Sequence, residues 1–255
     1  MSLDLTTGKR SVLFAKPGTP ANNRWYFDSQ GNILGLLVQS YAYIDRKTQR
    51  VVHETIPIPG PGQDVRFLST AADGRIYGGP DLGQNLFSYD PTKSQLISYD
   101  QVVDRTGEIY YSAELDGKIY SATYAEGGLS VFDPHKPWSP REKADSNPRA
   151  IVYLNDMQDQ NRPLAGIHRG PMGLLYVGTE PGYGLLGGAI SVLDPKTDHI
   201  DIYRNVISEE KITALAADDH YVYARSAPEG GTGSVSTAKG VHFFVWDPRS
   251  KNVCF

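Results

Sequence analysis

The amino-acid sequence predicts an all-β fold, a β-propeller of four-stranded antiparallel blades, and three observations support this prediction. Apolar segments that end in an Asp-containing turn recur along the chain. Asp-Gly pairs, a strong signal for a tight β-hairpin, lie between other apolar segments. The 255 residues include 26 Gly, 17 Pro and 16 Tyr, as expected for many short strands joined by turns. Repeats of roughly 40–50 residues made of short strands are typical of propellers.

The recurring turn has its best copies at 85–93, 129–135, 189–197 and 241–250, each with an Asp-Pro pair. Proline presets the backbone angle of the second turn position, and the Asp carboxylate accepts a nearby backbone N–H. We therefore expect each aspartate to mark the turn between the third and fourth strands, c and d, of a blade. The six turn aspartates are Asp4, Asp45, Asp90, Asp133, Asp194 and Asp247.

Five complete blades follow from this repeat, with a partial blade ahead of them. The first strands of the complete blades, the a strands, are expected at 25–27, 65–69, 109–113, 164–168 and 212–216. The partial N-terminal blade consists of a strand c at 2–5 and a strand d at 10–14. We interpret residues 1–255 as a single propeller domain. An unpaired strand edge promotes aggregation, which favours a fragment of a longer ring over a five-bladed ring with a spare hairpin.

Composition and charge exclude several classes of protein. The net charge of −4, without clustered Lys or Arg, argues against nucleic-acid binding. No apolar run reaches the roughly 18–20 residues of a membrane-spanning helix. The N-terminal residues lack the basic and apolar regions of a signal peptide, and export remains open if the native N-terminus lies upstream. Cys254 is the only cysteine, so there is no internal disulfide or cysteine-based metal site.

The long connections are expected on one face of the propeller. In a four-stranded blade, the b–c and d–a connections share one face and the a–b and c–d turns share the other. Here the second set contains tight turns, whereas the long segments, such as 178–188 and 225–240, belong to the first set. Binding residues concentrate on loops that a rigid scaffold holds, so we expect the functional site on this loop-rich face.

Four successive b–c loops each carry one carboxylate among glycines. Equivalent positions in successive blades would place these carboxylates in an arc. Oxygen ligands on loops suit Ca²⁺ or several sugar hydroxyls, although surface loops are commonly rich in acidic residues without any binding role. The four carboxylates are Asp81, Glu126, Glu180 and Glu229.

A candidate catalytic group lies at the predicted strand a of the fourth blade. His168 and Arg169 are expected near the loop-rich face, close to Glu180 and Tyr183. A His or Tyr base beside an Arg that neutralises a carboxylate can abstract a proton α to that carboxylate, as in cleavage of uronic-acid chains. The alternative is a histidine bonded to the backbone beside a solvated arginine.

Two further strand-a segments begin with residues suited to sugar binding. Arg24 and Trp25 open one segment, and Arg66 opens the next. Exposed aromatic rings stack on sugar rings, and arginine pairs with acids. The alternative for Trp25 is packing between blades.

The pattern Asp-Gly-x-Ile-Tyr, a glycine-rich loop, and then an apolar strand with Asp-Pro-x-Thr resembles bacterial β-propeller repeat proteins of the quinoprotein-like and Kelch-like kind. The segment 177–197 carries this resemblance most clearly. The resemblance covers nearly the whole chain and implies the fold, but fold alone does not specify function. The tryptophan-rich docking motif of quinone-dependent dehydrogenases is missing, so no quinone is expected.

The sequence favours a ligand-binding module for carbohydrate or another polar or anionic small molecule at the loop-rich face. One alternative is a carbohydrate-active enzyme of lyase or hydrolase type. Another is a protein-interaction scaffold that uses the outer loops. Apart from Ca²⁺, the sequence indicates no cofactor.

Overall fold

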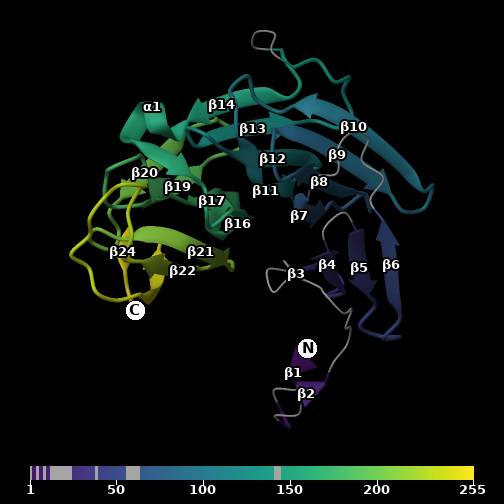
Figure 1. Cartoon of the computed structure of the whole chain (residues 1–255), viewed down its shortest axis with the longest axis horizontal. Helices are drawn as coiled ribbons and strands as arrows, with labels where there is room; N and C mark the ends of the chain where they lie inside the picture. Colours follow the sequence, from purple (N-terminus) through teal and green to yellow (C-terminus); the bar gives the residue numbers. More distant parts are fainter. Residues whose placement is uncertain are drawn as a thin grey trace. The chain divides into compact units, whose positions relative to one another are not determined.

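The computed structural model describes residues 2–3, 6–7, 10–11, 25–37, 40–55, 64–140 and 145–255. Five four-stranded antiparallel blades follow one another along the chain, preceded by a two-stranded hairpin, and the four blades within residues 66–255 are arranged as in a propeller (Figure 1). The predicted fold class and the count of five blades are therefore confirmed. In the described residues, α1 (Leu154–Gln158) is a single short turn of helix, and no helix is long and apolar enough to cross a membrane.

The chain forms two compact units, Met1–Val65 and Arg66–Phe255. In the first unit, a hairpin of β1 (Ser2–Leu3) and β2 (Arg10–Ser11) lies in the region of the predicted partial blade, whose remaining residues lie outside the described ones. The first blade follows, in the predicted position. Its strands are β3 (Trp25–Phe27), β4 (Ile33–Leu37), β5 (Ser40–Ile44) and β6 (Val51–Thr55).

The second unit contains four blades, in each of which the strands pair in chain order from a to d. The strands of the first two are β7 (Val65–Thr70), β8 (Ile76–Pro80), β9 (Asn85–Asp90) and β10 (Gln95–Gln101), then β11 (Glu108–Leu115), β12 (Lys118–Tyr124), β13 (Gly128–Phe132) and β14 (Arg149–Tyr153). The strands of the last two are β16 (Ile167–Arg169), β17 (Leu175–Gly178), β19 (Ala189–Leu193) and β20 (Ile200–Arg204), then β21 (Lys211–Ala217), β22 (Val222–Ala227), β23 (Phe243–Asp247) and β24 (Asn252–Val253).

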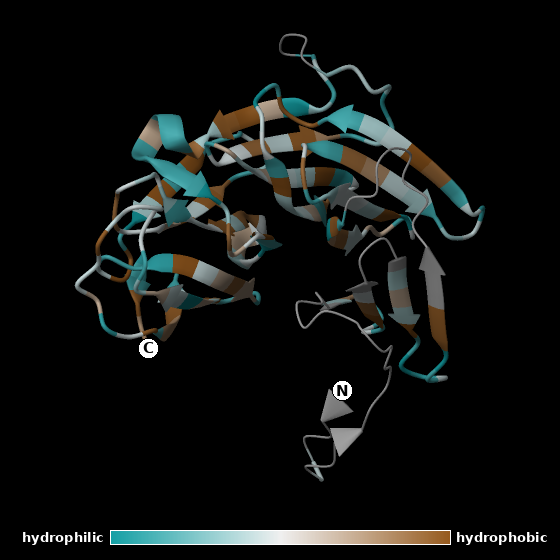
Figure 2. Cartoon of the chain, viewed as in Figure 1, coloured by the Kyte–Doolittle hydropathy of each residue, from teal (hydrophilic) through white to brown (hydrophobic). Residues whose placement is uncertain are grey.

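The core of the second unit lies between neighbouring blades, because side chains alternate between the two faces of each strand. In β19, Ile190 packs with Phe244 and Trp246 of the following blade, whereas Leu193 packs with Leu129 of the preceding one. Every residue of β19 is buried. Figure 2 shows the apolar residues recurring along these strands. Burial on both faces explains why the strands read as nearly continuous apolar runs.

The turn aspartates form the local structure that the repeat predicts. The Asp90 carboxylate accepts the backbone N–H of Thr92 at 3.0 Å, and the Asp194 carboxylate accepts that of Lys196 at 2.9 Å. Asp45, Asp133 and Asp247 bond in the same way to the residue two positions further on. These bonds begin the connection between strands c and d in every described blade.

Acid should destabilise the fold through these turns. The hydroxyl of Thr92, with further bonds to the same carboxylate, lowers the pKa of Asp90 to about 2. A carboxyl whose folded-state pKa is depressed stabilises the fold above its unfolded-state pKa, and the contribution is lost as the pH falls through the folded value. We expect the melting temperature to drop between about pH 4 and pH 2, and to drop less in Asp90→Asn, which keeps the acceptor but does not titrate. An equal drop in both proteins, followed by circular dichroism, would contradict this expectation.

Two predicted details were wrong. The c–d connections are not all tight, because residues 133–148 form a long connection in which Ser139 bridges to Asn147. The strand predicted at 164–168 is interrupted. Gly166 has a positive φ of 84°, and its N–H bonds back to the carbonyl of Pro163. This turn separates β16 from a preceding short strand, β15 (Gln160–Arg162), which pairs with β18 (Glu180–Pro181).

Candidate functional site

A group of interacting charged side chains on the loop-rich face of the second unit is centred on Arg162. Strands β15 and β18 extend the hairpin of their blade beyond its main sheet, and their register places Arg162 opposite Glu180. The Arg162 guanidinium Nη1 lies 2.6 Å from Glu180 Oε1. The Glu180 side chain is only 7% exposed. A carboxylate this deeply buried requires a cationic partner, which Arg162 supplies.

A second cation approaches the same carboxylate from the next blade. Lys211 begins β21, and its Nζ lies 3.3 Å from Glu180 Oε2. The same Nζ is 3.8 Å from an oxygen of Glu229, whose side chain is exposed. Two cations therefore flank one buried carboxylate, and the exposed Glu229 is only loosely attached to the second cation.

Two tyrosines complete the cluster. Tyr124 ends β12 of the preceding blade, Tyr183 follows β18, and their hydroxyls are hydrogen-bonded to each other. Arg162 Nη2 makes only long bonds to them, 3.4 Å to Tyr124 and 3.3 Å to Tyr183, and its guanidinium lies over both rings. Tyr183 is 56% exposed. We define the Arg162 cluster as Tyr124, Arg162, Glu180, Tyr183, Lys211, Glu229 and Thr232, whose hydroxyl lies 3.1 Å from Arg162 Nη1.

The protonation states of the cluster suit recognition of an anion. Burial lowers the pKa of the Arg162 guanidinium, but its bond and charge pair with Glu180 raise it, and the net change is upward. The bond to Tyr124 raises the pKa of the Tyr183 phenol, so Tyr183 is a neutral hydroxyl at physiological pH. The cluster thus presents a permanent planar cation, an ammonium and phenol hydroxyls, which are groups that bind carboxylates and sugar hydroxyls.

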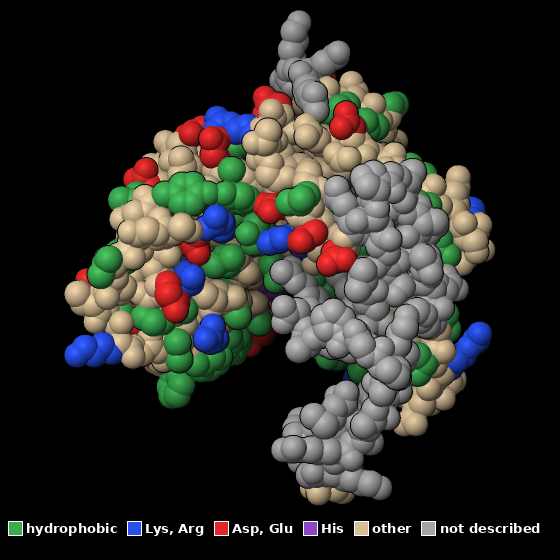
Figure 3. Space-filling model, in the orientation of Figure 1, with side chains coloured by type: hydrophobic (Ala, Val, Ile, Leu, Met, Phe, Trp, Pro, Cys, Tyr) green, Lys and Arg blue, Asp and Glu red, His purple; other side chains and the backbone are tan. Residues whose placement is uncertain are grey.

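Aromatic and charged residues continue from the cluster into the first blade of the second unit. The Tyr110 ring makes an edge contact with Tyr124 at 6.1 Å, and the Arg66 guanidinium lies 3.9 Å from the centre of the Tyr110 ring. Arg66 is bonded to Asp81 at 2.7 Å. Burial raises the pKa of the nearby Glu108 carboxyl despite the opposing effect of Arg66. Figure 3 shows acidic and basic side chains interspersed on the visible face of the second unit.

Each of the four carboxylates predicted to form an arc has a basic partner. Glu126 pairs with Arg105, and the other three pair with the arginines and the lysine already described. In the part of the chain that the structure describes, no three His, Cys, Asp or Glu side chains converge as a metal site would require. A Ca²⁺ site at these loops stays a prediction.

The structure does not bring His168 and Arg169 to Glu180 and Tyr183. Arg169 pairs with Leu175, and His168 with Tyr176, so both lie toward the a–b turn. Glu180 is five residues beyond Leu175, about 16 Å along an extended chain. The His168 ring is held by the carbonyl of Ala165 at 2.8 Å, and burial lowers its pKa. The turn at 163–166 explains this separation. It places Arg162, rather than Arg169, at the end of the blade that carries the long loops.

Of the remaining residues predicted to bind a ligand, some lie in the part of the chain that the structure describes and others lie outside it. Arg66 and Asp81 form an ion pair with each other, as described above. Arg24 lies outside the described residues. Trp25 begins β3, and its side chain is likewise outside the description. A sugar-binding role for these two residues stays a prediction.

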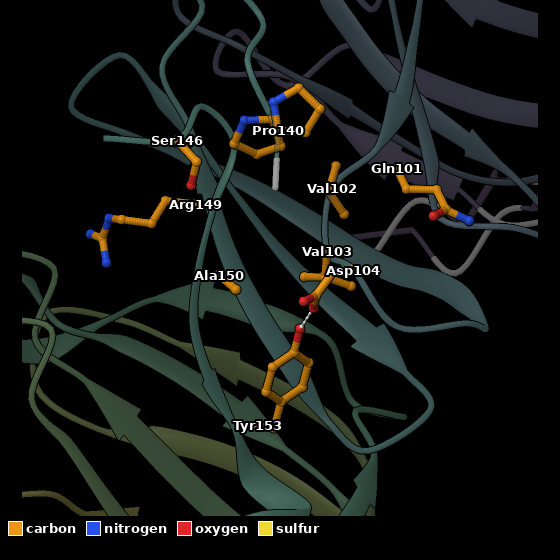
Figure 4. Close-up of a pocket in the computed structure, with 10 residues that line it drawn as sticks. Gln101, Val102, Val103, Asp104, Pro140, Ser146, Arg149, Ala150 and Tyr153 are labelled. Atoms are coloured by element: carbon orange, nitrogen blue, oxygen red, sulfur yellow. Dashed lines mark hydrogen bonds between the residues drawn. The ribbon is translucent and has the colours of Figure 1, made fainter. Parts of the chain in front are cut away.

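A separate pocket of about 230 Å³ lies beside β14 (Figure 4). At one end, the Tyr153 hydroxyl donates to Asp104, and burial followed by this bond raises the pKa of Tyr153 to about 12. Arg149, which also lines the pocket, is paired with Asp198 at 2.8 Å. Val102, Val103, Pro140 and Ala150 supply apolar lining. We favour the Arg162 cluster as the functional site, because it brings two cations and exposed hydroxyl groups together on the loop-rich face.

No protein-family model matches the chain, and no curated protein is detectably similar in sequence. Solved structures are similar in three dimensions. Virginiamycin B lyase from Staphylococcus aureus aligns with a TM-score of 0.57 and 11% identity over 89% of this chain and 71% of its own. A chain of a nidogen/laminin complex aligns with a TM-score of 0.60 and 9% identity, over 91% of this chain and 77% of its own. A chain of a mitotic checkpoint complex aligns with a TM-score of 0.63 and 10% identity, over 99% of this chain and 72% of its own.

These proteins are β-propellers. This chain shares their fold. At such low identities the similarity extends to the fold alone, and propellers serve many unrelated functions. The fold is that of a general module for binding ligands or proteins, and any specific function has to be argued from the site.

Proposed function

We propose that this β-propeller is a binding module whose Arg162 cluster recognises a carbohydrate, or another polyhydroxylated molecule, that carries an acidic group. The observation that supports the proposal most directly is the pairing of one buried carboxylate, Glu180, with two cations, Arg162 and Lys211. The second amino group of Arg162 makes only long contacts to phenol hydroxyls. A ligand carboxylate could bind there with better geometry than either phenol provides.

The exposed members of the cluster would contribute the remaining contacts. Glu229 is 3.8 Å from the Lys211 ammonium, and a ligand carboxylate could replace it. The exposed ring of Tyr183 would provide an apolar surface against a sugar ring, while the phenol hydroxyls bond to sugar hydroxyls. Tyr124, Arg162 and Lys211 come from three successive blades, so a bound ligand would bridge all three.

Binding accounts for the cluster better than turnover does. A lyase needs a base, and the raised pKa of the Tyr183 phenol disfavours its ionised form at neutral pH. The half-buried His168 bonds to the carbonyl of Ala165. An acidic peptide could use the same cations, so it belongs among the ligands to be tested.

A thermal-shift screen would test the proposal. The panel contains neutral and acidic oligosaccharides of matched length, together with an acidic peptide. A ligand that binds only the folded state raises the melting temperature by mass action. We expect the acidic oligosaccharides to give the largest shift and Tyr183→Ala to reduce it.

Tyr221→Ala is the matched control, because Tyr221 is a partly exposed tyrosine at the turn end of the last blade. It should leave the shift unchanged. Equal shifts with neutral and acidic sugars, or a full shift in Tyr183→Ala, would refute the proposed site. A shift with the acidic peptide alone would identify a protein partner instead.

A further inference from the structure

A buried glutamate and an exposed histidine form a second ionisable group in the last blade. Glu210 immediately precedes β21, and its side chain is 2% exposed. The Ser226 hydroxyl donates to Glu210 Oε2, and His242 Nδ1 lies 2.9 Å from the same oxygen. The His242 side chain is 55% exposed. The histidine can therefore exchange protons with solvent while its partner is shielded from it.

These contacts fix one end of the connection between β22 and β23. His242 is the last residue before β23, and its carbonyl accepts the N–H of Ser226 at 2.9 Å. Its own N–H bonds to the Ser226 hydroxyl at 3.2 Å. The imidazole adds a link from this connection, residues 228–241, to the segment that leads into β21.

A neighbouring glutamate holds the middle of the same connection. Glu209 accepts hydrogen bonds from the Ser236 hydroxyl and from both the N–H and the hydroxyl of Thr237, at 3.2, 2.7 and 2.9 Å. The Thr237 N–H is the main cause of a lowered pKa for the Glu209 carboxyl, which therefore stays ionised at neutral pH. The charge of Glu209 therefore does not change near neutral pH. The contact between His242 and Glu210 is the one whose charge can change there.

The 228–241 connection also contributes directly to the Arg162 cluster. Thr232 contacts Arg162, and Glu229 contacts Lys211. The carbonyl of Thr232 accepts the N–H of Gly184, next to Tyr183, at 3.0 Å. A Cβ atom on Gly231 would lie 1.9 Å from the carbonyl oxygen of Gly182, so the two segments pack backbone against backbone. Movement of the connection would disturb the cluster.

We propose that Glu210 and His242 form a pH-dependent latch that holds the 228–241 connection against the Arg162 cluster. Histidine changes charge in the range of about pH 5 to 8. The imidazolium pairs with the buried Glu210 carboxylate, whereas the neutral imidazole leaves that carboxylate without a cation. The connection is therefore held at the acidic end of the range and loosened as the pH rises. The effect on ligand binding rests on the proposed function, but the latch does not.

Other charged groups beside the latch are engaged elsewhere. Lys211 contacts Glu180 and Glu229, Arg225 bonds to Thr213, and Glu209 bonds to residues 236–237. Lys239 is exposed. Across the described ranges, His242 is the only basic side chain that forms an ion pair with Glu210.

Hydrogen–deuterium exchange of the whole chain would test the latch. Exchange rates of the 228–241 connection are measured at about pH 5.5 and about pH 8 and converted to protection factors, which removes the intrinsic pH effect. The amides of Gly231 and Thr237 are informative because both are hydrogen-bonded. We expect protection to fall roughly tenfold at the higher pH, as for loss of a charge-assisted hydrogen bond, while β21 stays unchanged.

Two variants separate the latch from a general pH effect. His242→Gln can still donate a hydrogen bond but cannot titrate, so its protection should be low at both pH values. His199→Gln removes an exposed histidine of the c–d turn that pairs with exposed Asp201, and should keep the wild-type pH dependence. Equal protection of the wild type at both pH values, or an unchanged pH dependence in His242→Gln, would overturn the latch.

A binding arm keeps the two proposals distinguishable. Tetragalacturonate is titrated into the wild type at the same two pH values, and binding should be weaker at the higher one. pH-dependent protection without tetragalacturonate binding at either pH would support the latch and count against the proposed ligand. Binding of tetragalacturonate together with pH-independent protection of the 228–241 connection would support the proposed ligand and count against the latch.

Discussion

Replacing Arg162 with methionine is expected to abolish binding of an acidic oligosaccharide and to destabilise the protein by about 1–3 kcal/mol. The variant removes the cation 2.6 Å from the buried Glu180 carboxylate and leaves only Lys211, at 3.3 Å, to compensate it. The cost is moderated because Arg162 is not fully buried. Urea unfolding would give the change in the free energy of unfolding, and calorimetry would give the binding.

A double variant distinguishes loss of binding from loss of stability. Arg162→Met combined with Glu180→Met removes both partners, so no buried charge is left unpaired. Apolar replacement of a buried ion pair is often neutral or stabilising. The double variant should therefore recover most of the stability lost in Arg162→Met without recovering binding. If it were less stable than the single variant, our description of the ion pair would be wrong.

Trp246→Ala is expected to cost about 3–5 kcal/mol of stability, the usual range for truncating a buried aromatic side chain. Trp246 is 1% exposed and lies between the last two blades. Its ring contacts those of Tyr176 and Tyr203 at centroid distances of 6.3 and 5.0 Å. Its removal would leave a cavity at the interface that joins these blades.

Phe243 is the matched control for this substitution. It lies in the same strand, β23, but its side chain is 64% exposed. Phe243→Ala should change the free energy of unfolding by no more than about 0.5 kcal/mol. Similar losses in the two variants, measured by urea denaturation, would show that the packing between the last blades is not as described.

The fold could be predicted because its determinants are local and repeated. Each turn aspartate bonds to a backbone N–H two residues away, so the motif at Asp90 or Asp194 is complete within a few residues of sequence. Alternation of apolar residues then sets which blade each strand residue faces. The interruption at 163–166 was missed, since the positive φ of Gly166 matters only through the pairing of β15 with β18.

The candidate site could be predicted only in part. Glu180, Tyr183 and Glu229 were already candidates from the sequence, because they lie in glycine-rich loops of the expected face. Arg162 was missed, although an arginine just before a proline in a d–a connection is a signal that could have been weighed. Its neighbours Tyr124 and Lys211 are 38 and 49 residues away in sequence, counted from their residue numbers. Contacts between blades can be predicted from a sequence repeat only when the alignment of neighbouring blades is known to within one residue.

Glu210 and His242 were missed for the same reason. Glu210 follows another acidic residue in a connection, and His242 immediately precedes a strand, so neither stands out alone. Three adjacent strands bring them together with Ser226. Such a group becomes visible only when the cross-strand register is available.

The most direct test of the central claim is calorimetric titration of the protein with tetragalacturonate, beside a neutral oligosaccharide of the same length. Arg169→Met serves as the matched control for Arg162→Met, because Arg169 lies at the opposite end of the same blade. If the Arg162 cluster is the binding site, the wild type should bind one ligand per chain and prefer the acidic sugar. Binding should be lost in Arg162→Met and in the double variant, and should be complete in Arg169→Met. Binding that survives both Arg162 variants, or that disappears in Arg169→Met, would contradict it.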